Sequence, residues 1–174
     1  MSDAFEQAKA QRNWLERLGE KIPGFSGFKD RELRRDVDKR ERDHLASAVG
    51  EIKHALRQQA RAYTDAGQIA ALTPFDRLER RLDGLAQAIR HADYGASGLF
   101  DAVKIGEAEL IRLYQFDLSL VEEIATLAGL VAAVPKPGGD SPAAALELAA
   151  DHLGALEQKW AEREQVVTGA VSAT

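Results

Sequence analysis

Residues 73–92 read TPFDRLERRLDGLAQAIRHA, and this stretch carries bulky apolar side chains three or four positions apart. On a helix of 3.6 residues per turn these side chains share one face, while the charged residues between them point the other way. Thr73 followed by Pro74 is typical of a helix start, with Thr73 as the N-cap and the proline at the first helical position. The spacing predicts an amphipathic helix over 73–92, with this apolar face: Phe75, Leu78, Leu82, Leu85 and Ile89.

The same spacing recurs in four other stretches, which glycine and proline separate from one another. We expect helices over residues 3–20, 30–64, 106–134 and 142–167. Because the links between the last four helices are short, these helices should pack antiparallel around a shared core that contains Leu82, Ile124 and Leu153. The sequence therefore predicts an all-α fold, an antiparallel four-helix bundle of long helices with an additional N-terminal helix.

All 174 residues are expected to form a single helical domain. Residues 1–29 hold the N-terminal helix and a Pro/Gly/Phe loop, residues 30–167 form the bundle, and residues 168–174 form a frayed tail.

The composition excludes several classes of protein. The chain has no cysteine, which excludes disulfides, thiolate metal sites and cysteine nucleophiles. Its first residues lack the basic and apolar regions of a secretory signal. The most apolar stretch, residues 124–134, is far shorter than the roughly 20 residues that cross a bilayer. We expect a cytoplasmic protein without a transmembrane segment.

A dense run of charge occupies residues 29–43, with seven basic and six acidic side chains. One interpretation is a solvated helix stabilised by ion pairs three or four residues apart. The other is an interaction surface, a basic stripe for RNA, DNA or anionic lipid, to which the preceding loop adds two aromatic rings. We do not expect nucleic acid as a partner, because the interleaved acids cancel much of the positive field, with a net charge of −5 for the whole chain. The candidate surface residues are Phe25, Phe28, Arg31, Arg34, Arg35 and Arg42.

The spacing Glu-x-x-His, which places two metal ligands on one helical face in di-iron bundles, occurs at Glu41 with His44 and again at Glu51 with His54. A dinuclear site takes one such copy from each of two helices, whereas both copies here fall on one predicted helix. Asp117 lies in an apolar stretch, where it is either a buried functional carboxylate or part of a polar seam beside an arginine or tyrosine. We predict no catalytic residue, cofactor or metal, and keep Glu41, His44 and Asp117 as weak candidates.

Two blocks of the sequence resemble a known family. The run IPGFSGFKDRELRRDVDK at residues 22–39 and the block ADYGASGLFDAVK at residues 92–104 are similar to segments of an uncharacterised family of bacterial all-helical proteins. That family has no assigned activity. The resemblance implies a bacterial source and a coherent single domain, and it transfers no site residue.

These observations favour a non-enzymatic protein-interaction or scaffold module, an accessory protein that binds a protein partner or itself. The long predicted helix over 30–64 and the apolar loop before it offer surface that the core does not need. One alternative is a metal- or ligand-binding enzyme with its site in the bundle core. Another is a protein that contacts anionic membrane peripherally, through residues 3–20 and the charged run.

Overall fold

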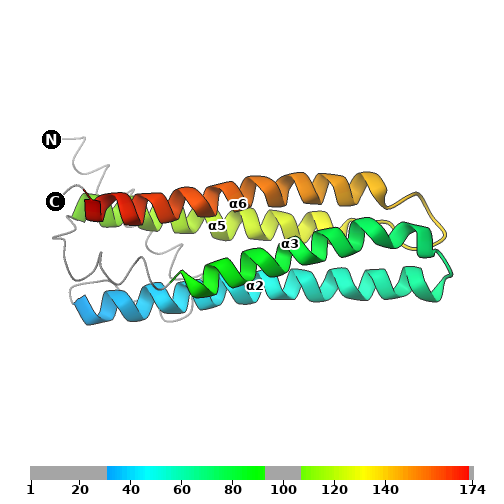
Figure 1. The fold of residues 1–174 in the computed structure, drawn as a ribbon, viewed down its shortest axis with the longest axis horizontal. Helices are drawn as coiled ribbons and strands as arrows, with labels where there is room; N and C mark the ends of the chain where they lie inside the picture. The colour runs from blue at the N-terminus through cyan, green and yellow to red at the C-terminus, as the bar shows by residue number, and fades with distance from the viewer. Residues whose placement is uncertain (1–30, 93–106, 173–174) are drawn as a thin grey trace, which may run out of the picture.

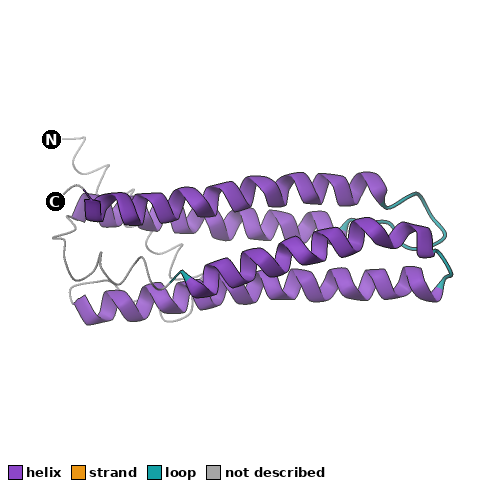
Figure 2. Cartoon of the chain, viewed as in Figure 1, coloured by secondary structure: helices purple, strands orange, loops and turns teal. Residues whose placement is uncertain are grey.

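The computed structural model describes residues 31–92 and 107–172, and over these residues the protein is helical, with no strand. The predicted all-α class is confirmed for this part of the chain (Figure 2). The predicted N-terminal helix, the Pro/Gly/Phe loop and most of the block at 92–104 lie outside the described residues. The helices are α2 (Arg31–Asp65), the 3-10 turn η1 (Ile69–Ala71), α3 (Leu72–His91), α5 (Glu107–Ala132) and α6 (Ala143–Ser172).

The first hairpin consists of α2 and α3. Lys53 on α2 pairs with Asp83 on α3, and Arg57, one turn further along α2, pairs with Glu79, one turn earlier on α3. The residue number increases on α2 from one pair to the next and decreases on α3, so the two helices run in opposite directions, as Figure 1 shows.

The second hairpin consists of α5 and α6. Asp117 and then Glu123 on α5 bind Arg163 and then Lys159 on α6, so these two helices also run in opposite directions. The residues between them, 133–142, reverse the chain within a short loop (Figure 1).

The two hairpins pack side by side through parallel contacts. The side-chain amide of Gln59 donates to the carbonyl of Val131, and the Tyr63 hydroxyl donates to the carbonyl of Pro135, so both partners advance together with an offset of 72 residues. On the other side of the bundle, α3 contacts α6. Among the described helices, α2 therefore lies beside α3 and α5, and α6 lies beside α5 and α3 (Figure 1).

The core lies between the four helices and takes its apolar residues from each of them. Leu82, Ile124 and Leu153, which the sequence placed inside, are all buried. Complete burial of one such side chain contributes about 1.5–3 kcal/mol to the free energy of folding. The core residues with the lowest exposure include Val49, Leu56, Phe75, Leu78, Leu82, Leu120, Leu127, Leu146 and Leu153.

Gly67 ends α2. Its φ of +73° belongs to the left-handed region, which glycine adopts without steric cost. The Gly67 amide donates to the carbonyl of Thr64 and the Gln68 amide donates to that of Tyr63, which is the hydrogen-bond pattern of a Schellman C-cap. The chain thereby turns into η1 and then α3.

The predicted start of α3 needs a correction. Thr73 is not its N-cap, because the helix begins at Leu72 and the N-cap position falls on Ala71, without a side-chain cap. Pro74 is thus the third residue of α3, still within the first turn, where its missing N–H leaves no helical hydrogen bond unmade. At the other end of the chain, α6 continues to Ser172, beyond the expected end at residue 167.

Candidate functional site

A groove runs between α2 and α5, and its volume is about 310 Å³. Buried Leu45, Ile52 and Ile124 line it from the core side. Five alanines, most of them exposed, line the rest: Ala48 and Ala55 on α2, and Ala125, Ala128 and Ala132 on α5. The groove is therefore an apolar trough that is open to solvent.

The groove follows from the sequence and the register of the two helices. The offset of 72 residues places Ile52 level with Ile124, so these two close the floor. Alanine side chains end at Cβ and leave the space above that floor unfilled. His44 and Glu51 are the polar side chains among the lining residues. The sequence analysis did not single out the alanines of this groove. The signal it missed is the three-and-four spacing of Ala125, Ala128 and Ala132.

The two halves of the Glu41–His44 pair lie in different environments. Glu41 is fully buried, whereas His44 is half-buried and lines the groove. In the second pair, His54 is exposed and hydrogen-bonds to Gln58 on its own helix. Within the described ranges, no three His, Asp or Glu side chains are grouped as ligands for a metal ion.

Asp117 forms a buried ion pair with Arg163, and the exposed fractions of the two side chains are 0% and 2%. Arg163 Nε donates to Oδ1 at 2.6 Å and Nη2 donates to Oδ2 at 3.2 Å, so both carboxylate oxygens are engaged. The guanidinium also stacks over the ring of Trp160, 5.1 Å from its centroid. The geometry is that of the polar seam beside an arginine, which was the structural interpretation of Asp117. The sequence did not identify Arg163 as the partner.

Arg42 differs from the sequence prediction, which placed it on an interaction surface. Its side chain is 3% exposed, and Nη1 donates to the carbonyl of Arg90, near the C-terminal end of α3. A guanidinium at a helix C-terminus meets unsatisfied carbonyls and the negative end of the helix dipole, which accounts for this position. Phe25 and Phe28 lie outside the described residues, as do the side chains of Arg31, Arg34 and Arg35.

The buried charges gather towards one end of the bundle. Applying the offset of 72 residues to Arg42 places it level with residue 114, about one helical turn from Asp117. Glu41 precedes Arg42 on α2, and Arg163 lies on α6 against Asp117. Among the described residues, the buried charged side chains are two carboxylates and two guanidiniums, so their formal charges sum to zero. Such balanced groups are expected in a structural network, because an uncompensated charge in a core is costly.

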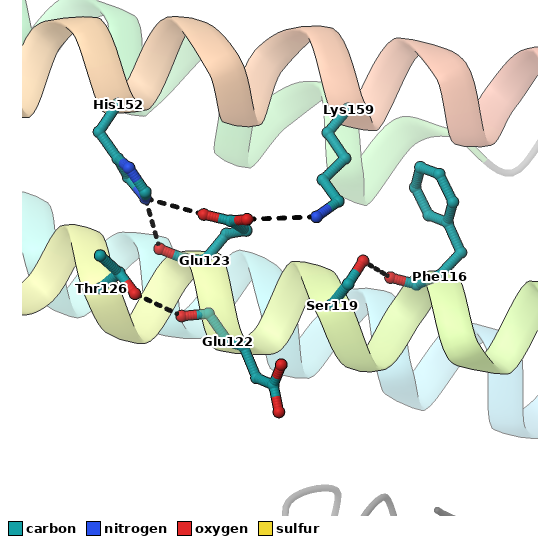
Figure 3. A network of polar contacts seen from close by, with 7 residues as sticks. All are labelled: Phe116, Ser119, Glu122, Glu123, Thr126, His152 and Lys159. Atoms are coloured by element: carbon teal, nitrogen blue, oxygen red, sulfur yellow. Dashed lines mark hydrogen bonds and ion pairs between the residues drawn. The ribbon is translucent and has the colours of Figure 1, made fainter.

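A second polar cluster joins α5 to α6 closer to the surface (Figure 3). His152 and Lys159 of α6 flank Glu123 of α5, and Lys159 Nζ lies 3.3 Å from its carboxylate. His152 Nε2 lies 3.0 Å from the Glu123 carbonyl oxygen and 3.2 Å from its carboxylate. Both oxygens can only accept, so Nε2 carries a proton in this arrangement. The cluster therefore connects α5 to α6 through hydrogen bonds and ion pairs.

An ion pair between Arg81 and Glu157 also connects α3 to α6. The Arg81 guanidinium donates to the Glu157 carboxylate and to the Ala150 carbonyl at 2.9 Å. It crosses α6 at Gly154, where an added Cβ would lie 3.1 Å from Arg81 Nη2. The absence of a side chain at Gly154 thus makes room for this arginine.

Exposed ion pairs hold α2 and α3 together on the outside. The hydrogen bond and the positive charge of Lys53 hold the pKa of Asp83 below its ordinary value of 3.8. The hydrogen bond and the charge of Glu79 raise the pKa of Arg57. These shifts arise from direct pairing at the surface and need no functional explanation.

Comparison with protein-family models, with curated proteins and with solved structures finds no match to the chain. None of the helices in ranges 31–92 and 107–172 is both long enough and apolar enough to cross a membrane.

Proposed function

We propose that this chain is a non-enzymatic protein-interaction module, a scaffold or accessory protein that binds its partner through the groove between α2 and α5. The single observation that supports this function is an apolar trough that stays open to solvent beside a filled core. Apolar surface that folding leaves in water is available to drive association.

The shape and chemistry of the groove suit a helix better than a small molecule. Small-molecule sites combine an apolar cavity with several convergent polar groups that fix the ligand's orientation. Here the polar side chains among the lining residues are His44 and Glu51, and alanines from two neighbouring helices form much of the rest. An amphipathic helix can lie along such a trough with its large side chains against the alanines.

The candidate polar residues support a structural role for the bundle interior. Asp117 is occupied by Arg163 through both of its oxygens. Glu41 is buried and His44 lines the groove, and within the described residues no three His, Asp or Glu side chains are grouped as ligands for a metal ion. Their arrangement supports a binding protein over the alternative of a metal-dependent enzyme in the bundle core.

Ala128→Arg tests the proposed function, because it puts a charged side chain into the groove without touching the core. Ala128 is exposed, so the variant should fold, which circular dichroism would verify. Ala155→Arg, on an exposed position of α6, is the matched control. The charge should weaken partner binding at least tenfold, a loss of about 1.4 kcal/mol.

The measurement is quantitative mass spectrometry of proteins that co-purify with the tagged full chain from its source cells, together with the solution mass by light scattering. We expect the same partner, or the same oligomer, with the unchanged chain and with Ala155→Arg, and a loss with Ala128→Arg. A strictly monomeric chain that recovers no protein would contradict the proposal. Equal recovery by Ala128→Arg would contradict the groove as its site.

The remaining parts of the proposal rest on the sequence. They are an antiparallel four-helix bundle with an additional N-terminal helix as the arrangement of the whole chain, coiled-coil packing, a bacterial source and a cytoplasmic location.

A further inference from the structure

The chain contains a segment of its own that fits the groove. Residues 3–20, ahead of α2, are predicted from sequence to form a helix with a narrow apolar stripe. Phe5, Ala8, Leu15 and Leu18 form the stripe, and charged side chains surround it. A narrow stripe cannot support a core of its own, but it suits an apolar trough that lies between two helices.

The connection is long enough to bring this segment to the groove. From Arg31, where α2 begins, to His44, where the groove begins, α2 rises about 20 Å. Residues 23–30 can span up to about 26 Å when extended. Pro23, Gly24 and Gly27 in this connection favour a reversal of the chain.

The segment would also lie in a favourable direction and with a suitable length. After a reversal it would run antiparallel to α2, and also antiparallel to α5, because α2 and α5 are parallel to one another. A helix over 3–20 is about 27 Å long, and the groove from His44 to Ala55 is about 17 Å long. Leu15 and Leu18 would then fall within the groove, where the alanines leave space for larger side chains.

Tethering favours this occupant over any free partner of similar chemistry. A segment on a short linker has an effective concentration in the millimolar range, so even weak intramolecular affinity fills the groove. We propose that residues 3–20 of the same chain cover the groove between α2 and α5 in the unbound protein, and that a partner helix must displace them. The inference rests on the proposed function in one respect: the partner helix that would displace residues 3–20 is the partner proposed above.

Paramagnetic relaxation tests the inference in the full chain. The sequence has no cysteine, so Ala128→Cys gives a single attachment site for a nitroxide label in the groove. Ala155→Cys, on an exposed position of α6, gives the control site. We expect the label at position 128, but not the label at position 155, to abolish the amide signals of residues 8–18. Adding Leu15→Asp and Leu18→Asp should restore those signals.

Three results would overturn the inference. The first is that the two labels affect residues 3–20 equally. The second is that the aspartate substitutions leave the signals unchanged. The third is that the loss of signal occurs only between molecules, when spin-labelled chain is mixed with isotope-labelled chain, which would assign the groove to a second copy.

The failure of this inference is distinguishable from the failure of the proposed function. If residues 3–20 do not cover the groove, partner recovery should still depend on Ala128, and only the inference fails. If they do cover it and recovery is indifferent to Ala128→Arg, only the proposed function fails. When both hold, the Leu15→Asp and Leu18→Asp variant should recover more partner than the unchanged chain, because its groove is open.

Discussion

Asp117 and Arg163 show how a charged residue can belong to a core. Each has lost nearly all its contact with water, and the two-pronged hydrogen bonding between them replaces that contact. Such a pair adds little net stability compared with apolar residues of the same size, but a single partner left behind is strongly destabilising. The pair therefore fixes how α5 and α6 align more than it increases the free energy of unfolding.

Asp117→Asn should lower the free energy of unfolding by about 3–5 kcal/mol, because it removes one charge of a buried, hydrogen-bonded ion pair. Asp117→Leu combined with Arg163→Met should be much closer to the unchanged protein, because it removes both charges. Urea denaturation followed by circular dichroism measures both variants. A loss below about 1 kcal/mol in the single variant, the value of a surface pair, would contradict the burial.

Asp83 gives the protein a pH-dependent contribution at its surface. The pairing with Lys53 lowers the pKa of Asp83 in the folded state, so the unfolded chain takes up the proton first as the pH falls. The stabilisation is complete above the unfolded pKa, near 3.8, and disappears as the pH falls through the lower folded pKa. Urea titrations at pH values from neutral to pH 2 measure the free energy of unfolding of the unchanged protein and of Asp83→Asn. The unchanged protein should be slightly more stable at neutral pH, and this difference should disappear as the pH falls through the pKa of Asp83. A stability difference that increases as the pH falls would contradict the lowered pKa of Asp83.

The interior of each helix is predicted by the spacing of its apolar side chains, whereas the residue at which a helix begins or ends depends on backbone conformation. The spacing correctly predicted four helices within the described ranges, but it misplaced the start of α3. There the helix begins at Leu72, directly after η1, so that Thr73 and Pro74 both fall inside the first turn. A Thr-Pro pair is compatible with more than one position in a first turn, so local sequence alone does not fix the boundary.

Substitution of two glycines tests a helix end and a helix interior separately. Gly67→Ala should destabilise the protein by about 1–2 kcal/mol, because alanine is strained at the positive φ of the α2 C-cap. Gly84→Ala should stabilise it by about 0.5–1 kcal/mol, because Gly84 lies within α3 and an added Cβ would meet no atom within 4 Å. Thermal melting should show opposite shifts of the midpoint. Shifts of the same sign would contradict the assigned backbone conformations.

The two hairpins meet through α2 and α5, which run parallel, and the groove lies at this contact. The hydrogen bonds of Gln59 and Tyr63 to backbone carbonyls set the offset of α2 against α5. On the opposite side, Arg81 reaches across α6 at Gly154. Side-chain contacts between residues that are far apart in the sequence therefore determine which alanines face each other across open space.

The spacing of apolar residues is sufficient to predict the helical class and apolar residues of the core, because that periodicity reports the angular position of side chains around a helix axis. That information is local, and it sufficed to place Leu82, Ile124 and Leu153 inside. Three features arise when the helices pack against one another: Arg163 pairs with Asp117, Arg42 is buried at the end of α3, and a groove stays open between α2 and α5. These features depend on the relative translation of helices along one another, and the periodicity within a single helix carries no information about that translation.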